Sequence, residues 1–352
     1  MERAYRVPVT PEQEDRVQRL QEDTFIFDGL ATYYLDKDYV KKLRAVGVNA
    51  IHYTVGFNSL MHGHFLQDNF VMTCQKIGRW YRILEECQQD VALATSIVEM
   101  EEVTKNGRIA VFFGFQNGSP LEDNLDYLHI FYRLGVRFIM LTYNTRNFIG
   151  SGSGERVDSE LSDFGVRVVK EMNKLGMAVD LSHCGYQTTL DAIQCSDMPV
   201  LFTHANVRAL ADTTRNKTDD LICLLAEKGG VMGIKSMLGN TKTKLAEETT
   251  VADVVDQIEY VANLVGIGHV ALGTDFPGTV HSLDEANAEI NFLRTLSPKA
   301  YLGKRIKPAG FETIDGLPNV TRELVKRGYS DEDIAKIYGK NLIRVLRVIF
   351  RH

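Results

Sequence analysis

Eight short apolar runs, each followed by a stretch with helical periodicity, constrain this chain more than any other feature of its sequence. The runs are apolar nearly throughout, as parallel strands buried on both faces must be. They comprise residues 24–30, 48–55, 109–116, 136–144, 177–183, 198–204, 230–236 and 269–275. Because the alternation is regular and no long linker interrupts it, the pattern favours one closed (β/α)8 barrel, an α/β fold of the TIM-barrel type. The alternative is an open, doubly wound sheet, and the positions of the polar residues argue against it.

The length of the chain agrees with a single barrel. Its 352 residues are many for an ordinary domain but normal for this fold, so we expect residues 1–352 to form one domain. The region 276–320 lacks clear periodicity and contains four prolines, which predicts a long excursion after the eighth strand and a candidate lid. Residues 321–352 have the pattern of C-terminal helices, and Ser330 is suited to cap the last of them.

Charge and targeting signals narrow the class of partner. The net charge of −6 argues against a nucleic-acid surface or an anionic membrane surface. The polar N-terminus has no apolar core of a signal peptide, and no run of 18 apolar residues predicts a membrane span. The five cysteines are an odd number without paired metal-type spacing, as in reduced cytoplasmic proteins. We therefore expect a cytoplasmic protein that acts on a small molecule.

Polar residues end five of the predicted strands, and this predicts where the chemistry takes place. These residues are Gln116, Tyr143, His183, His204 and Asp275. One such residue alone usually caps the next helix or satisfies a loop. In a barrel, however, all five converge on the carboxyl ends of the strands, where the active sites of barrel enzymes lie. The sequence therefore predicts a functional site at that mouth.

The residue types at this mouth suggest a metal-assisted reaction on a carboxylate-bearing compound. His183 and His204 could be imidazole ligands to one divalent metal from adjacent strands. Asp275 could be a third ligand, a general base or an anchor for a substrate ammonium group. Arg215, in the loop after His204, could hold a substrate carboxylate in a bidentate fork, or could be a solvated charge at the start of a helix. A further pair, His62 and His64, has the spacing of a small metal clip but lacks a carboxylate.

Several ordered segments resemble the renal (membrane) dipeptidase family, the M19 metallopeptidases of the metal-dependent, amidohydrolase-like barrels. The most specific segment is LSDFGVRVVKEMNKLGMAVDLSHCGYQTTLDAI, followed by PVLFTHANVRALADTTRNKTDD and KGGVMGI. LGTDFPG and the tail GYSDEDIAKIYGKNLIRVL also match, so the likeness runs from about residue 25 to about residue 347. It implies a TIM barrel of the metal-dependent hydrolase kind and the hydrolysis of small dipeptides.

The family pattern assigns roles to four residues of this chain. Members of the family typically carry two zinc ions, held by an HxD motif on strand one, a bridging Glu on strand three and two His on strands five and six. His183 and His204 match the last two ligands. Arg215 matches the arginine that binds the substrate carboxylate, and Asp275 matches the aspartate near the substrate amine and the scissile bond.

The chain departs from the family pattern at the remaining ligands. Where the family reads DGHND, this chain has Leu30 in place of the His and Thr32 in place of the Asp. Gln116 replaces the bridging Glu, and Tyr143 replaces a His that helps to stabilise the tetrahedral intermediate. A ligand that bridges two dications must be an anion, because its charge offsets their repulsion. We therefore expect at most one ion, zinc or another divalent metal, or none.

Three functions remain open on this sequence. The first is a dipeptidase-like hydrolase of a small dipeptide or amide with a free carboxylate, in which Asp275 and Tyr143 assist the chemistry. Arg215, Gln116, Asn117 and Thr32 would bind the substrate. The second is a metal-independent enzyme on an amino-acid-like compound, with the histidines as acid and base. The third is a barrel that binds a small ligand without turnover. Because members of this family often dimerise, the resemblance also suggests a homodimer.

Overall fold

Eight parallel strands form a nearly closed barrel in the computed structural model, which confirms the predicted (β/α)8 fold. The structure describes residues 5–33, 35–55, 68–238, 241–278 and 307–350. The barrel strands are β1 (Ile26–Tyr33), β2 (Val48–Thr54), β4 (Ile109–Phe115), β5 (Val136–Met140), β6 (Ala178–Asp180), β7 (Leu201–Ala205), β8 (Val231–Ile234) and β9 (Val270–Leu272). They pair in chain order with no reversal, which excludes the doubly wound alternative.

Two further strands extend the sheet beyond the eight that the sequence predicted. The short strand β3 (Val91–Leu93) pairs with β4 in parallel, outside the order of the barrel. The two-residue strand β10 (Pro277–Gly278) pairs with the end of β1, so that Thr32 lies opposite Pro277. The chain that follows the last barrel strand therefore starts at the carboxyl end of the first one.

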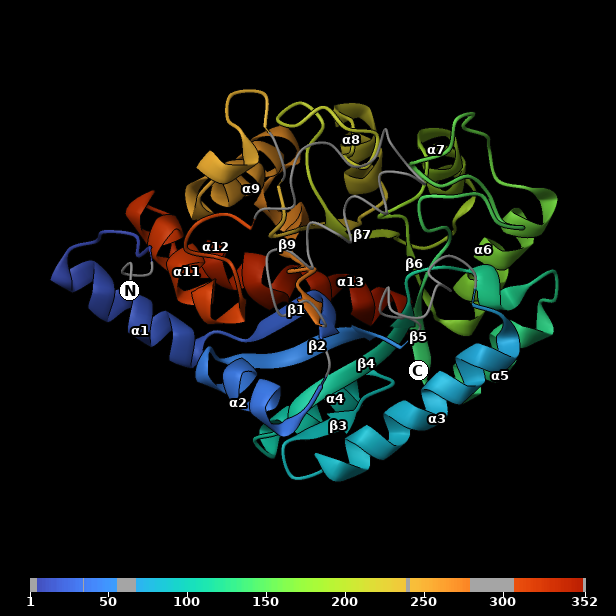
Figure 1. Ribbon diagram of the computed structural model, residues 1–352, viewed down its shortest axis with the longest axis horizontal. Helices are drawn as coiled ribbons and strands as arrows, with labels where there is room; N and C mark the ends of the chain where they lie inside the picture. Colours follow the sequence, from blue (N-terminus) through green and yellow to red (C-terminus); the bar gives the residue numbers. More distant parts are fainter. Residues whose placement is uncertain (1–4, 34, 56–67, 239–240, 279–306, 351–352) are drawn as a thin grey trace.

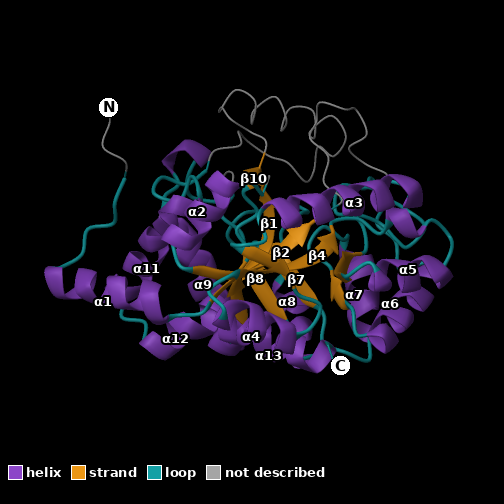
Figure 2. Cartoon of the chain, turned by 90° about the horizontal axis from the view of Figure 1, so that it is seen from below, coloured by secondary structure: helices purple, strands orange, loops and turns teal. Residues whose placement is uncertain are grey.

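Helices surround the strands, as Figures 1 and 2 show. Around the barrel they are α2 (Lys37–Ala45), α3 (Phe70–Glu86), α4 (Ile97–Lys105), α5 (Asp126–Arg133), α6 (Asp163–Leu175), α7 (Tyr186–Cys195), α8 (Asp219–Glu227) and α9 (Val251–Val265). The terminal helices are α1 (Pro11–Asp23), α11 (Leu317–Lys326), α12 (Asp331–Ala335) and α13 (Asn341–Ile349), with a π-helical turn at Lys336–Lys340. None of the helices in the described ranges combines the length and the apolar content that a bilayer crossing needs.

The two helices with the clearest sequence signals begin and end where their caps require. Ser162 caps α6, because its hydroxyl accepts the Gly165 N–H, and Gly176 ends the helix at φ 73°, a left-handed conformation that suits glycine. Thr250 caps α9 in a reciprocal capping box, and its own N–H is accepted by Asp253. These local signals fix the lengths of the barrel's outer helices.

The amino end of the barrel is filled with apolar side chains and closed by α13. Phe112 and Phe138 from neighbouring strands lie within the barrel, and their rings contact each other edge to face. Phe350, directly after α13, packs against both rings at centroid distances of 5.8 and 5.7 Å. The buried side chains of Leu346 and Ile349 complete this plug. Within the described residues, this plug fills the amino end of the barrel and leaves the carboxyl ends of the strands as the side for a functional site.

The layer above the plug is built from glycines that let the strands approach closely. A Cβ on Gly273 would lie 1.9 Å from the Thr203 carbonyl oxygen, and one on Gly233 would lie 2.1 Å from the same oxygen. No side chain fits at either position. Glycine on β8 and directly after β9 therefore fixes the place of Thr203, the residue before His204.

The first and last strands of the barrel are joined by a buried carboxylate. Asp28 on β1 accepts the Thr274 N–H at 2.7 Å and the Thr274 hydroxyl at 2.6 Å. The Asp275 N–H also donates to the Leu30 carbonyl at 3.1 Å. These bonds span 246 positions of the chain and close the ring of strands.

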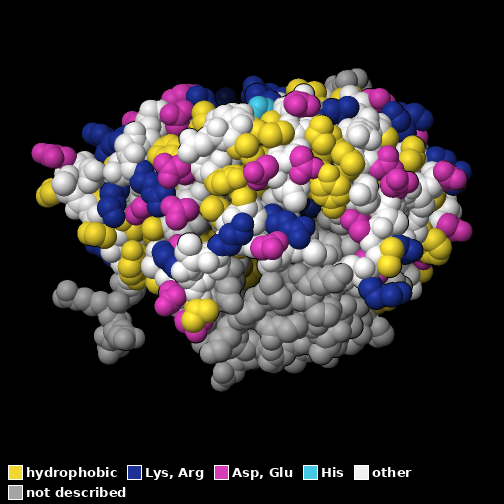
Figure 3. All heavy atoms as spheres, turned by 90° about the horizontal axis from the view of Figure 1, so that it is seen from above, with side chains coloured by type: hydrophobic (Ala, Val, Ile, Leu, Met, Phe, Trp, Pro, Cys, Tyr) yellow, Lys and Arg dark blue, Asp and Glu magenta, His cyan; other side chains and the backbone are white. Residues whose placement is uncertain are grey.

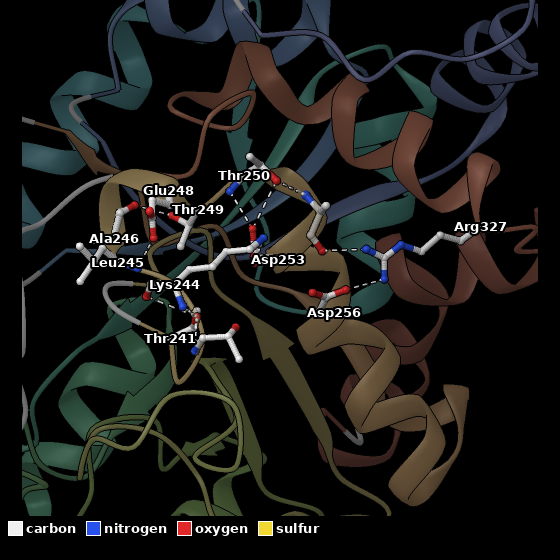
Figure 4. A network of polar contacts seen from close by, with 12 residues as sticks. Thr241, Lys244, Leu245, Ala246, Glu248, Thr249, Thr250, Asp253, Asp256 and Arg327 are labelled. Carbon is white, nitrogen blue, oxygen red and sulfur yellow. Dashed lines mark hydrogen bonds and ion pairs between the residues drawn. The ribbon is translucent and has the colours of Figure 1, made fainter.

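The loop between β8 and α9 is held by a polar network that Figure 4 shows. The Lys244 ammonium lies 2.7 Å from Asp253, which is buried, and Asp253 also accepts the Thr250 N–H. Arg327, the residue that caps the end of α11, pairs with Asp256 at 2.7 Å and so ties α9 to the C-terminal helices. The network keeps one of the loops at the carboxyl face in a fixed place.

Part of the predicted excursion can be traced at both of its ends. It begins with β10, and its return is fixed where the Ala309 N–H donates to the Thr249 carbonyl and the Val251 N–H donates to the Ala309 carbonyl. Residues 279–306, and with them the candidate lid, lie outside the described residues, as do His62 and His64. On the face that Figure 3 draws, acidic and basic side chains are interspersed over the described part of the surface.

Candidate active site at the carboxyl end of the barrel

The two predicted histidines meet at the carboxyl end of neighbouring strands. Asp180 on β6 pairs in register with Leu201 on β7, and each histidine lies three residues further along its chain. Their Nε2 atoms are 3.0 Å apart, and their ring centroids are 5.0 Å apart. Both side chains are buried, at 4% exposure for His183 and 0% for His204. The sheet register therefore accounts for a pair that the sequence separates by 20 residues.

The outer ring nitrogens of both histidines have hydrogen-bond acceptors. His183 Nδ1 lies 2.7 Å from Asn144 Oδ1, and His204 Nδ1 lies 2.8 Å from Thr203 Oγ1. With each Nδ1–H engaged in this way, the neutral rings turn their Nε2 lone pairs toward each other. Two lone pairs at 3.0 Å repel unless a cation or a proton lies between them.

The surroundings keep both imidazoles neutral. Burial lowers the pKa of His183 and of His204 well below the ordinary histidine value, and the nearby positive charge of Arg215 lowers both pKa values further. Neutral imidazole is the form in which histidine binds a metal ion. Both Nε2 atoms are therefore available as lone-pair donors, although the positive charge of Arg215 nearby opposes the binding of a further cation.

Arg215 and Lys217 hold the backbone around this pair. The Arg215 guanidinium donates to the Ser182 carbonyl at 2.5 Å and to the His204 carbonyl at 2.7 Å. Lys217 donates to the carbonyls of Leu181 at 2.7 Å and Cys184 at 3.2 Å, and burial lowers the pKa of its amine to about 7. Arg215 is only 2% exposed, so the alternative of a solvated charge is wrong.

Tyr143 and Gln116 lie after β5 and β4, the strands that continue this side of the barrel. The Tyr143 ring stacks on the His183 ring at a centroid distance of 4.2 Å and an interplanar angle of 20°. Gln116 is 6% exposed, and within the described residues its amide nitrogen has no hydrogen-bond partner. A buried donor of this kind is costly unless a ligand or water accepts from it. Of these residues, Gln116 is the one whose buried donor most clearly indicates a bound ligand or water.

Asn117 and Thr32 make bonds within the protein. The Asn117 side-chain oxygen accepts from the Ser119 N–H at 3.1 Å and from the Asn147 amide at 2.9 Å, which shapes the loop after β4. The Thr32 hydroxyl donates to the Phe276 carbonyl and so links β1 to the chain after β9. Both residues lie at the carboxyl end of the barrel, and both have structural roles there.

Asp275 and Leu30 face each other across the seam of the barrel. Asp275 adopts a left-handed backbone with φ 51°, and its N–H donates to the Leu30 carbonyl. Leu30 is fully buried and offers no metal ligand. Burial raises the pKa of the neighbouring Asp28 to about 7, although the bonds from Thr274 oppose the shift. Within the described ranges, no three His, Cys, Asp or Glu side chains are grouped as metal ligands would be.

Sequence reasoning did not identify three residues that support the histidine pair. Asn144 holds the His183 ring from a left-handed backbone with φ 58°, and Thr203 holds the His204 ring. Asp180 in turn holds Thr203, with an oxygen 2.6 Å from its hydroxyl. The available signal was a carboxylate and a hydroxyl within strands that are otherwise apolar.

The fold and the site define a class of protein. A (β/α)8 barrel with paired imidazoles at the carboxyl ends of adjacent strands is the arrangement of amidohydrolase-like barrels. A sequence profile of the membrane dipeptidase family (peptidase family M19) matches residues 14–299 and 296–351 of this chain. The chain therefore belongs to the membrane dipeptidase family, which confirms the resemblance seen in the sequence.

Individual relatives agree with this assignment. The chain is 30% identical to the dipeptidase tcpJ of Claviceps purpurea over 295 residues, which cover 83% of this chain and 62% of the relative. It is also 30% identical to the dipeptidase verJ of Clonostachys rogersoniana, over 78% of this chain and 64% of the relative. The chain thus spans about three-fifths of the length of the curated relatives it matches.

Solved structures match along nearly the whole chain. An amidohydrolase from Pseudomonas aeruginosa superimposes with a TM-score of 0.83 at 29% identity, covering 96% of this chain and 99% of that one. The probable dipeptidase PvdM from the same organism has a TM-score of 0.79 at 19% identity, covering 97% of this chain and 100% of that one. At that lower identity the likeness supports the fold alone.

Proposed function

We propose that this chain is a dipeptidase-like hydrolase that acts on a small dipeptide or amide with a free carboxylate and uses at most one metal ion. The observation that carries the proposal is the pair His183 and His204, whose Nε2 atoms lie 3.0 Å apart while each Nδ1 is engaged elsewhere. Membership of the dipeptidase family supports the reaction class. The number of metal ions and the kind of substrate are inferred from this chain's own residues.

One ion fits the pair of imidazoles. Two nitrogens bound to one zinc at about 2.0–2.1 Å in tetrahedral geometry lie about 3.3 Å apart. The distance of 3.0 Å between the Nε2 atoms is close to that value. Because both rings also donate through Nδ1 to a second group, they have the orientation typical of metal-binding histidines. The remaining positions around an ion would be filled by water, by substrate or by the Gln116 side-chain oxygen.

A second ion does not fit the residues at the other side of the mouth. The family's strand-one ligands are replaced by Leu30, which has no donor atom, and by Thr32, whose hydroxyl donates to Phe276. Gln116 cannot supply the negative charge that a bridge between two dications requires. These three replacements support a mononuclear rather than a dinuclear centre.

The side chains around the pair would bind the substrate and move a proton. A metal ion, when bound, supplies Lewis acidity toward a carbonyl and lowers the pKa of a bound water. The Arg215 cation, which lies against the carbonyl of His204, would attract the substrate carboxylate. The Gln116 amide would donate to a substrate oxygen, and Asp275 would accept and pass on a proton. Tyr143, stacked on His183, would form one wall of the pocket.

Metal content tests the proposal directly. Protein purified without chelator should carry close to one equivalent of zinc, manganese or cobalt after reconstitution, measured by elemental analysis. The double variant His183→Ala and His204→Ala should carry less than about a tenth of that amount. The matched control is His129→Ala, because His129 lies on the surface and pairs with Glu171. Two equivalents in the wild type would contradict a mononuclear centre, and none would contradict a metal site.

Hydrolysis of matched substrates tests the reaction. Dipeptides with a free carboxylate should be cleaved by the metal-loaded protein, while the same dipeptides with a C-terminal amide should be cleaved at least about tenfold more slowly, since they lack the group that Arg215 would attract. Cleavage that continues in metal-free protein and stops in His204→Ala would favour the metal-independent alternative. Binding of dipeptides without cleavage in any metal form would favour a binding protein.

A further inference from the structure

Asp180 is the centre of a buried hydrogen-bond network directly behind the histidine pair. Its Oδ1 accepts the backbone N–H groups of Ser182 at 3.0 Å and Thr203 at 3.1 Å, and also the Ser182 hydroxyl at 2.6 Å. Its Oδ2 accepts the Thr203 hydroxyl at 2.6 Å. Asp180 is fully buried, as are Ser182 and His204. All four bonds go to the carboxylate, so both of its oxygens act as acceptors.

This carboxylate determines the direction of the next hydrogen bond. A threonine hydroxyl has a single proton. Since that proton is donated to Asp180, the Thr203 oxygen can only accept from His204 Nδ1, which lies 2.8 Å away. His204 is therefore held as the tautomer with the proton on Nδ1. Its Nε2 then carries the lone pair that faces His183.

We propose that Asp180 is a positioning residue that sets the tautomer of His204 through the hydroxyl of Thr203. The same carboxylate also orients the Ser182 hydroxyl, which accepts the His204 backbone N–H at 3.1 Å. Asp180 thus fixes both the place of His204 and the nitrogen that it presents. The inference rests on the proposed function for the use of that nitrogen as a metal ligand, but the tautomer itself does not depend on it.

A second aspartate repeats the arrangement at the seam of the barrel. Asp28 accepts the N–H of the residue two positions on, Leu30, and both the N–H and the hydroxyl of Thr274, which follows the neighbouring strand β9. Thr274 precedes Asp275 as Thr203 precedes His204. Because this second unit has no histidine, it provides a matched control for changes at the first.

Substitution of Asp180 by Asn should reverse the tautomer. Two backbone N–H groups donate to Asp180 Oδ1, and in an asparagine only the side-chain oxygen can accept them. The asparagine NH2 group must then take the place of Oδ2, which faces the Thr203 hydroxyl. The hydroxyl must then accept from the amide and donate to His204 Nδ1. His204 should therefore move its proton to Nε2. Zinc affinity at the pair should fall by about 10–100-fold, as for other losses of a group that orients a metal ligand.

The tautomer can be read by NMR on full-length, metal-free protein labelled with 15N-histidine. His204 is assigned by its loss in His204→Ala, and each ring is followed through its two-bond 1H–15N couplings. We expect protonated Nδ1 in the wild type and protonated Nε2 in Asp180→Asn. Thr203→Val should remove the preference, and Thr203→Ser, which keeps the hydroxyl, should restore it. Asp28→Asn should leave His204 unchanged.

The outcomes separate this inference from the proposed function. An unchanged His204 tautomer in folded Asp180→Asn and Thr203→Val would overturn the role of Asp180, whatever the protein binds. Zinc titration by calorimetry gives the second readout. A wild type that binds no zinc but shows the predicted change of tautomer would overturn the metal site and leave the role of Asp180 in place. If Asp180→Asn does not fold, the comparison of Thr203→Val with Thr203→Ser decides the question.

Discussion

Three buried imidazoles, those of His52, His183 and His204, lie in or near the interior of the barrel. The pKa of each is lowered by burial, and that of His52 falls to about 4 although Asp180 opposes the shift. His52 donates from Nδ1 to the Gly29 carbonyl oxygen at 2.8 Å, because that oxygen can only accept. It stacks on Phe138 at 4.1 Å. These groups stay neutral in the fold and become charged when the chain unfolds below pH 6.5.

The first prediction at this scale concerns acid stability. A histidine with a pKa near 6.5 when unfolded and about 4 when folded takes up more protons in the unfolded state as the pH falls, so stability is lost on acidification. Between pH 7 and pH 5 the loss is about 2 kcal/mol for one such group. His52→Asn, whose amide can still donate to Gly29, should lose about 2 kcal/mol less stability than the wild type over this range. Urea unfolding at both pH values measures the difference.

The wild type must be compared with His52→Asn, because Asp28 changes the stability with pH in the opposite direction. Its pKa is raised from 3.8 to about 7, so its contribution to stability is present at low pH and is lost as the pH rises through 7. The wild type alone reports the sum of both effects. His129→Ala, which changes an exposed histidine, should behave as the wild type does. Equal pH dependence in the wild type and His52→Asn would contradict the role given to burial.

At the scale of elements, Gly233 on β8 and Gly273 directly after β9 determine where β7 lies. Gly273→Ala would place a Cβ 1.9 Å from the Thr203 carbonyl oxygen, which is backbone and cannot rotate away. We expect a loss of about 3 kcal/mol or more in the free energy of unfolding. Gly78, inside α3, has nothing within 4 Å of such a Cβ, so Gly78→Ala should stabilise the protein by about 0.5–1 kcal/mol. Urea unfolding of the two variants should give changes of opposite sign.

The sequence predicted the elements better than their ends. Each of the eight apolar runs overlaps a barrel strand, because continuous apolar character is what a strand buried on both faces requires, although β1 and β7 extend beyond their runs. The run at 177–183 is longer than β6 (Ala178–Asp180), because the polar residues at the end of the run lie beyond the strand pairing, at the site. The strand β3 was missed, since three residues are too few to show a period. Strand ends near a site are set by side-chain bonds rather than by hydrophobic pattern.

The same distinction applies to the site. His183 and His204 could be placed together from the sequence, because both end a predicted strand and the register of parallel neighbours brings such ends to one level. The buried position of Arg215, whose guanidinium donates to two backbone carbonyls, could not be predicted from the sequence. An arginine in a loop has the same sequence signal whether it is solvated or enclosed. Asp180 was hidden within an apolar run, because its importance lies in bonds to Thr203, 23 positions further along the chain.

At the scale of the whole molecule, the C-terminal helix is part of the barrel's core. Leu346 on α13 is fully buried against the barrel interior, whereas Val348 on the same helix is 44% exposed. Leu346→Ala should lower the free energy of unfolding by about 2–5 kcal/mol, and Val348→Ala should change it by about 0.5 kcal/mol or less. Chemical unfolding checks both values. A similar small effect for the two variants would show that the plug does not belong to the cooperative unit.

The helix α1 packs beside α11 and α12 on the outside of the barrel. Glu14 on α1 pairs with Arg322 on α11 at 2.7 Å, and Arg16 pairs with Asp331 at 2.6 Å, so the first helix lies beside the last ones (Figure 1). Together with the bond between Asp28 and Thr274, these contacts bring early segments of the sequence beside late ones. The fold is thus tied together by contacts between residues more than 200 positions apart.

This closure has a consequence for how the protein is made in the cell. While the ribosome is still adding residues, β1 has β2 on one side and nothing on the other, because Thr274 and the return of the chain have not yet emerged. A nascent chain with seven of its eight strands would expose an apolar strand edge for many seconds at ordinary rates of translation. We therefore expect the barrel to close only after residue 275 has left the ribosome, and chains truncated before that point to depend on chaperones and to be removed by proteases.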